Sequence, residues 1–299
     1  MGADLSSDKV YKGREVSYQV LHRVLHGGAY SNLVITGAFE KDDMNPDERR
    51  VVLTLVYGVL RNLTLLDEVF RSKAKKGKLT VAPALLLLGR MAIYEMLFQT
   101  KTPVYASASE YVKMARARCS VPEAKFLNAV LRRVGQDDKA TVLEAAPNRE
   151  ARIALEFSHP EWFVRSAIAS FGMADCMKML RAHNTGMPSY FRVNTSKVSV
   201  KEIMDIFRSF RLEVEKMPNL PTCIYFRSGQ NFFPSKEFEA GWVTPQDYST
   251  QLIAHILAPK PGESVLDLCS GRGTKATHAA EIMGGRGRIV ACDLYDSKI

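Results

Sequence analysis

The 299-residue sequence predicts a multidomain chain with an all-α helical bundle first, a small α+β domain next and the beginning of a doubly wound α/β domain last. Three observations lead to this prediction. Apolar residues recur at helical spacing through about the first 140 positions. Near residue 190 this spacing gives way to short runs rich in β-branched and aromatic residues. From residue 264 onward, a strand, a glycine turn, a helix and a second strand follow one another.

Residues 1–140 have the pattern of a helical bundle. Val16, Val20 and Val24 lie one helical turn apart, and two glycines at positions 27 and 28 close that helix. Asn45 and Glu48 form a capping-box pattern for the next helix, whose apolar stripe continues to position 70. Further helices are predicted at 82–98, 104–118 and 122–134. Five or more helices with short connections predict a compact bundle.

Residues 141–237 combine linker helices with a small α+β domain. A helical pattern covers about 149–184, and the run from Tyr190 to Asn194 predicts a strand. Ser199 and Glu202 form a capping box for the helix that follows. Two short β-rich runs, at 212–215 and 223–226, come next and are separated by a turn that contains prolines.

Residues 238–299 predict the start of a nucleotide-binding sheet. A strand at 265–268 leads into a turn with Gly271 and Gly273, and a second strand ends at Asp293, twenty residues after Gly273. Glycine allows the backbone to pass close to a ligand, and a carboxylate at Asp293 can accept hydrogen bonds from ribose hydroxyls. A merely structural turn is the alternative. The glycine spacing differs from the dinucleotide fingerprint and is closer to that of S-adenosylmethionine-binding domains.

The net charge of +9 is unevenly distributed along the chain. Residues 1–140 contain 22 basic and 15 acidic side chains, so most of the excess lies in the predicted bundle. This favours a polyanionic partner such as RNA, although an ordinary basic surface is the alternative. The five cysteines form no Cys-x-x-Cys pair, which disfavours a metal site or a disulfide framework. Because no signal peptide or membrane-spanning run is evident, a cytoplasmic protein without a membrane partner is expected.

Several stretches of the chain resemble one known family. They are Leu55-Val-Tyr-Gly-Val-Leu-Arg61, Lys125-Phe-Leu-Asn-Ala-Val-Leu-Arg132, Ser158-His-Pro-Glu-Trp162, Phe191-Arg-Val-Asn-Thr195 and Asp267-Leu-Cys-Ser-Gly-Arg-Gly-Thr-Lys275. In this order they resemble the Sun/RsmB-type (Nop family) ribosomal RNA (cytosine-5) methyltransferases with an N-terminal NusB-like domain. The resemblance implies a NusB-like RNA-binding domain at 1–140, linker helices and a small α+β domain at 141–237, and the start of an incomplete Rossmann-like methyltransferase domain at 238–299.

The resemblance also implies a binding site for the cofactor S-adenosylmethionine. Lys275 is expected to supply a cation for the methionine carboxylate, and Asp293 an acceptor for the ribose. Arg272 stands where the family usually has a proline, which makes the turn less rigid. The implied cofactor-binding residues are Cys269, Ser270, Gly271, Arg272, Gly273, Thr274, Lys275 and Asp293.

Basic and amide side chains are candidates for contacts with RNA. Arg192 and Asn194 alternate at the end of one predicted strand and can address a phosphate and a base edge. The alternative is a structural hydrogen-bonding pair that ties the small domain to the methyltransferase domain. Cations near the last helices of the bundle are candidates for phosphate contacts. The RNA-binding candidates are Lys125, Arg132, Arg133, Arg192 and Asn194.

The implied activity is cytosine-5 methylation of 16S ribosomal RNA, as part of rRNA processing. The family uses cysteines in a Pro-Cys and a Thr-Cys segment, because a thiolate that adds to C6 of cytosine makes C5 nucleophilic. In the family both segments lie on later strands of the methyltransferase sheet, and residues 238–299 of this chain contain neither. The catalytic cysteines are therefore expected beyond Ile299, this chain is predicted to be inactive, and Cys269 and Cys292 are assigned to the cofactor half. The alternative is a non-enzymatic NusB-like RNA-binding or assembly protein.

Overall fold

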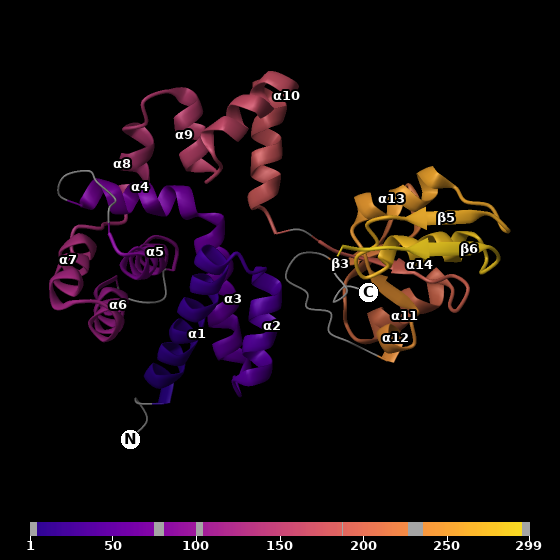
Figure 1. The fold of residues 1–299 in the computed structure, drawn as a ribbon, viewed down its shortest axis with the longest axis horizontal. Helices are drawn as coiled ribbons and strands as arrows, with labels where there is room; N and C mark the ends of the chain where they lie inside the picture. The colour runs from indigo at the N-terminus through magenta and orange to yellow at the C-terminus, as the bar shows by residue number, and fades with distance from the viewer. Residues whose placement is uncertain (1–4, 75–80, 100–103, 187, 227–235, 295–299) are drawn as a thin grey trace. The chain divides into compact units, whose positions relative to one another are not determined.

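The computed structural model describes residues 5–74, 81–99, 104–186, 188–226 and 236–294. The chain divides into two compact units, Met1–Asn184 and Thr185–Ile299, which we call the helical unit and the sheet unit. In the described residues the helical unit contains helices only, whereas the sheet unit combines strands and helices (Figure 1). The predicted fold class is confirmed: the helical unit has the all-α bundle, and the sheet unit has the small α+β domain and the first strands of an α/β domain.

Ten helices make up the described part of the helical unit. They are α1 (Leu5–Gly27), α2 (Ser31–Lys41), α3 (Pro46–Arg61), α4 (Leu63–Lys73), α5 (Pro83–Phe98), α6 (Val104–Arg118), α7 (Val121–Leu131), α8 (Asp138–Glu144), α9 (Arg149–Glu156) and α10 (Glu161–Asn184). α5 is apolar around most of its circumference and packs against α1, α3, α4, α6 and α7. Such a helix requires neighbours on every side, so the core of the bundle is built around α5. α8 and α9 pack against α4 (Figure 1).

The apolar stripe that begins after Asn45 is divided between two helices. The Asn45 side chain accepts a hydrogen bond from the Glu48 backbone N–H at 3.0 Å, and the predicted capping box is present. However, α3 ends just before Asn62 and α4 begins just after it, so the expected continuous helix is wrong. The Asn62 side chain donates to the carbonyl oxygen of Gly58 at 2.8 Å. Side-chain bonds of this kind compete with regular helical hydrogen bonding.

An ion pair lies inside the core of the helical unit. Arg14 of α1 is buried and donates two hydrogen bonds to the Glu95 carboxylate of α5, at 2.9 and 2.8 Å. The hydroxyls of Ser107 and Tyr111 in α6 each donate to the same carboxylate at 2.8 Å. Burial alone would lower the pKa of Arg14, but the hydrogen bonds and the charge of Glu95 raise it above its ordinary value. One buried carboxylate thus joins three helices.

The linker helices predicted at 149–184 are α9 and α10. Together they contain a separate cluster of buried side chains, to which Ile153, Val164 and Leu180 belong. α10 is interrupted at Gly172, whose φ of +76° lies in the left-handed region that glycine adopts most readily. The bend lets both halves of α10 contribute side chains to this small core.

The sheet unit begins with a four-stranded antiparallel sheet and continues into a parallel pair of strands. Its elements are β1 (Ser189–Val193), α11 (Val200–Ser209), β2 (Val214–Met217), β3 (Leu220–Phe226), α12 (Lys236–Glu239), β4 (Val243–Pro245), α13 (Tyr248–Leu257), β5 (Ser264–Asp267), α14 (Thr274–Ile282) and β6 (Arg288–Ala291). The antiparallel sheet has the order β2-β3-β1-β4, and β5 pairs with β6 in parallel. The predicted strand at 212–215 is shifted toward the C-terminus, because the turn lies at residues 218–219.

Side chains alternate between the two faces of the antiparallel sheet. Phe191 of β1 and Ile224 of β3 are opposite each other and point, with Phe207 of α11, into the core of this domain. The neighbouring pair, Arg192 and Cys223, lies on the other face. α13 packs on this second face, so the antiparallel sheet lies between α11 and α13. α14 packs in turn against α13, β5 and β6.

Candidate functional site

The predicted cofactor loop joins β5 to α14. Gly271 and Gly273 have φ values of +55° and +75°, and Gly273 is the N-cap of α14. A Cβ atom built on either glycine would meet no atom within 4 Å. The backbone conformation therefore favours glycine at both positions, and the space in front of the loop is open to a ligand. The uncapped N-terminal N–H groups of α14 suit the carboxylate end of such a ligand.

Asp293 lies directly beside this loop. It follows β6, and its Oδ2 atom accepts a hydrogen bond from the Gly271 N–H at 2.8 Å. The Ser270 N–H donates to the carbonyl oxygen of Cys292 at 2.9 Å, which ties the loop to the end of β6 a second time. The structure thus brings the predicted loop and the predicted ribose acceptor together at the carboxyl ends of two parallel strands, the edge at which ligands bind in doubly wound sheets.

The remaining loop residues surround the same opening. Lys275 in the first turn of α14 donates from Nζ to the carbonyl oxygen of Cys269 at 3.4 Å. Arg272 and Cys269 are exposed, whereas Ser270 is buried. Thr274 begins α14. All eight residues of the predicted cofactor set therefore lie in one neighbourhood.

Asp267 is a further candidate that the predicted set does not include. It ends β5, and its Oδ1 atom accepts from the Cys269 N–H at 3.3 Å. Its Oδ2 atom is buried and has no hydrogen-bond partner among the described residues. An unpaired buried acceptor is costly, so a ligand with N–H or O–H donors fits beside the loop. An acidic residue that ends an apolar strand just before a glycine turn is a signal that could have identified Asp267 from sequence.

Arg192 is engaged inside the sheet unit. Its side chain is 1% exposed, and its guanidinium donates to the Thr274 carbonyl oxygen at 2.8 Å and to the Thr277 hydroxyl at 3.1 Å. It also forms an ion pair with Glu281, with Nε to Oε2 at 2.9 Å, and donates to Gln246. These contacts connect β1 to α14 and favour the alternative interpretation of Arg192, a structural tie between the small domain and the methyltransferase part.

Asn194 forms a local turn. Its Oδ1 atom accepts from the Ser196 N–H at 3.1 Å and from the Ser196 hydroxyl at 2.6 Å, and its backbone N–H donates to the Trp242 carbonyl oxygen at 2.8 Å. Side-chain bonds to the backbone two residues on are typical of Asx turns. In this structure Asn194 therefore stabilises the chain that leaves β1.

Two titratable groups of α14 lie beside Arg192. Burial lowers the pKa of His278 to about 4, and the Arg192 charge and the neighbouring His255 act in the same direction. Burial also raises the pKa of Glu281, an effect that the Arg192 charge opposes. His278 is therefore neutral at physiological pH. The positive charge of Arg192 is compensated by the carboxylate of Glu281.

The other predicted RNA contacts lie on the surface of the helical unit. Lys125, Arg132 and Arg133 are exposed, and Arg133 donates to the carbonyl oxygen of Lys73 at 3.1 Å. Arg132 lines a cavity of about 550 Å³ together with Arg116 and residues of α5, α6 and α7. The structure thus groups Arg132 with further cations around an apolar floor, an arrangement that is open to a polyanion.

The cysteines differ in their surroundings. Cys223 is buried in the small domain, and burial raises the pKa of its thiol to about 11. Cys176 is buried in α10, and burial raises the pKa of Cys119. These three thiols are poor nucleophiles because they stay protonated or enclosed. In the described ranges, no group of three or more His, Cys, Asp or Glu side chains is arranged to hold a metal ion.

The fold and the loop define a class of protein in which a helical bundle and a small α+β domain precede the first strands of a methyltransferase-type α/β domain. Three family models match in the same order: the NusB family at residues 12–136, the ferredoxin-like domain of RsmF/B-like methyltransferases at 159–232, and the 16S rRNA methyltransferase RsmB/F family at 254–299. The chain has the domain order of RsmB/F-type rRNA methyltransferases with an N-terminal NusB domain, so the resemblance found in the sequence is confirmed.

Curated relatives are similar along most of the chain. The probable ribosomal RNA small subunit methyltransferase B of Bacillus subtilis (strain 168) is 31% identical over 286 residues, which cover 96% of this chain and 63% of the relative. The probable ribosomal RNA small subunit methyltransferase B of Synechocystis sp. is 26% identical over 285 residues, or 94% of this chain and 63% of the relative. The chain therefore spans 63% of the length of these two relatives.

A solved structure has the same fold. The crystal structure of a protein designated PH0851 matches with a TM-score of 0.73 and 23% sequence identity, over 96% of this chain and 64% of that chain. At this identity the likeness concerns the fold alone. Among the helices in the described part of the chain, none is long and apolar enough to cross a membrane.

Proposed function

We propose that this chain is the RNA-binding and cofactor-binding part of a cytoplasmic S-adenosylmethionine-dependent RNA (cytosine-5) methyltransferase that acts on 16S ribosomal RNA. The cofactor loop carries the proposal, because its open glycine turn, the unpaired Oδ2 atom of Asp267 and the adjacent Asp293 lie together at the ends of β5 and β6. These groups fit the donor-rich and anionic parts of S-adenosylmethionine. When bound, the cofactor supplies the methyl group.

The residues of the loop have distinct parts in this proposal. The N-terminus of α14 and Lys275 hold the methionine carboxylate, since both favour negative charge. Asp267 accepts hydrogen bonds from the cofactor, and Asp293 shapes the loop through Gly271 and accepts from the ribose. Cations of the helical unit, Arg132 among them, bind RNA phosphates and position the substrate.

Replacing Asp293 by alanine is expected to weaken the binding of S-adenosylmethionine by about tenfold or more, because a hydrogen bond to a charged group contributes about 1.5–3 kcal/mol. Isothermal titration of the 299-residue chain with the cofactor measures this change. Asp205→Ala is the matched control, because Asp205 is exposed on α11 and pairs with Arg208 on the same helix. Equal affinity of the Asp293 variant and the unmodified chain would contradict the assignment.

Methyl transfer by residues 1–299 alone is expected to be absent, because the methyltransferase part at 238–299 has no Pro-Cys or Thr-Cys segment. The Thr222-Cys223 pair lies in the small domain, where burial raises the pKa of the Cys223 thiol to about 11. Incubation of the chain with labelled S-adenosylmethionine and unmodified rRNA tests this expectation. Stoichiometric formation of 5-methylcytosine would overturn it. If the chain binds RNA but ignores the cofactor, the basic bundle supports the second candidate, a non-enzymatic RNA-binding or assembly protein.

A further inference from the structure

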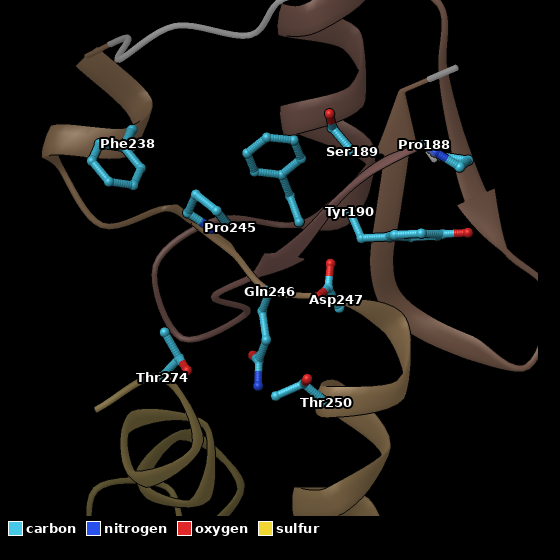
Figure 2. Close-up of a pocket in the computed structure, with 10 residues that line it drawn as sticks. Pro188, Ser189, Tyr190, Phe238, Pro245, Gln246, Asp247, Thr250 and Thr274 are labelled. Atoms are coloured by element: carbon cyan, nitrogen blue, oxygen red, sulfur yellow. The ribbon is translucent and has the colours of Figure 1, made fainter. Parts of the chain in front are cut away.

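A pocket of about 580 Å³ opens at the end of the small sheet, close to the start of α14. Its volume lies in the range of small-ligand sites. The walls come from the start of β1, the end of β4 and the first turns of α13 and α14, and they include Tyr190, Gln246, Asp247 and Thr250 (Figure 2). Among the described residues that line the pocket there is no lysine or arginine, and Asp247 is acidic. An anionic phosphate is therefore a poor occupant of this described lining, and a neutral polar group is a better one.

Tyr190, which lines the pocket, has two further tyrosine rings close to its own. Tyr190 of β1 and Tyr225 of β3 are opposite each other in register, with ring centroids 5.7 Å apart. Tyr248 of α13 lies 6.4 Å from Tyr190 by the same measure. β1 and β3 are the two central strands of a four-stranded antiparallel sheet. Aromatic side chains of this kind stack the unpaired bases of single-stranded RNA.

Two polar groups of opposite character complete the pocket. Gln246 is 5% exposed, and its Oε1 atom accepts from Arg192, which leaves the Nε2 amide to donate. This Nε2 atom is buried and has no partner within the described ranges, and Figure 2 shows the amide between Thr250 and Thr274. Asp247 is the N-cap residue of α13, yet its carboxylate accepts no capping bond from that helix. The pocket thus offers a buried donor and an accessible anionic acceptor.

We propose that this pocket binds one unstacked base of single-stranded RNA, stacked on Tyr190 and held by Asp247 and Gln246. This inference rests on the RNA binding in the proposed function and adds a base-reading subsite in the sheet unit. A carboxylate favours bases with an exocyclic amino group, such as cytosine. Uracil is disfavoured because two carbonyl groups flank its N3–H and repel the carboxylate.

Cytosine and uracil oligonucleotides test the subsite, because they share the phosphate backbone and differ at the base edge. We expect the 299-residue chain to bind a short fluorescent oligo-cytidine about tenfold or more tightly than the matching oligo-uridine in anisotropy titrations at fixed salt. Tyr190→Leu should weaken oligo-cytidine binding by between about 5-fold and 150-fold, since stacking contributes about 1–3 kcal/mol per base. Tyr190→Phe keeps the ring and should retain the affinity.

The Asp247→Asn variant tests base selection without a change in the core, because Asp247 is exposed. An amide can donate to a uracil carbonyl. The ratio of the Kd for oligo-uridine to the Kd for oligo-cytidine should therefore fall toward one. Phe210→Leu, which changes an exposed aromatic residue of the same unit outside the pocket, should have no effect. Equal binding of both oligonucleotides, or an unchanged preference in Asp247→Asn, overturns the subsite alone. No binding of either oligonucleotide overturns the RNA binding of the proposed function as well.

Discussion

Replacing Glu95 by alanine is expected to lower the free energy of unfolding of the helical unit by about 3–5 kcal/mol, because the substitution leaves Arg14 buried without its counter-charge. It also removes the acceptor of the Ser107 and Tyr111 hydroxyls. Urea denaturation followed by circular dichroism at the helical band measures the change, since most described helices belong to this unit.

Two further variants separate charge from packing at this position. Glu95→Gln keeps the volume and one acceptor but removes the charge, so it should remain strongly destabilising. The double variant Arg14→Met with Glu95→Leu removes both charges and should recover much of the stability, because well-packed apolar residues often replace a buried ion pair at little cost. Exposed ion pairs contribute up to about 1 kcal/mol to stability. If Glu95→Ala lowered the free energy of unfolding by less than this, the pair would be accessible to water.

Replacing Arg192 by alanine is expected to destabilise the sheet unit by about 3–5 kcal/mol. The change leaves Glu281 in a largely buried position without its partner, and it removes the donors to Gln246 and to the Thr274 carbonyl oxygen. The chain has two tryptophans, Trp162 in the helical unit and Trp242 in the sheet unit.

Tryptophan fluorescence makes the Arg192 experiment specific to one unit. Trp162 is 71% exposed, so Trp162→Phe is a mild change that leaves Trp242 as the reporter of the sheet unit. In this background Arg192→Ala should shift the urea midpoint of Trp242 fluorescence to lower concentration. Arg208→Ala is the control, because its ion pair with Asp205 is exposed. An equal midpoint in both variants would refute the structural role of Arg192.

Local patterns in the sequence predicted much of the secondary structure. The capping boxes at Asn45 and Ser199 are present because they depend on residues within one turn. The glycine loop and Asp293 meet as expected, because the carboxyl ends of neighbouring parallel strands lie at one edge of a sheet. The break at Asn62 was not predicted. The spacing of apolar residues indicates which face of a helix is buried, but it does not indicate whether the helix is continuous.

Contacts between distant residues could not be predicted in the same way. Arg192 meets partners in α14 that lie more than eighty residues later. The sequence of an arginine near the end of a strand is the same whether its guanidinium faces solvent or the interior. The pocket beside Tyr190 depends on the pairing of β1 with β3 and on the position of α13, so no single stretch of sequence contains it.

The tie between Arg192 and α14 also bears on how such chains can be recombined. Arg192 belongs to the small sheet, whereas Thr274, Thr277 and Glu281 belong to the helix after the cofactor loop. A chimaera joined between these two parts, with the sheet from one relative and the loop from another, has to preserve both ends of this contact. The two parts therefore behave as one exchangeable block, and a functional graft has to carry them together.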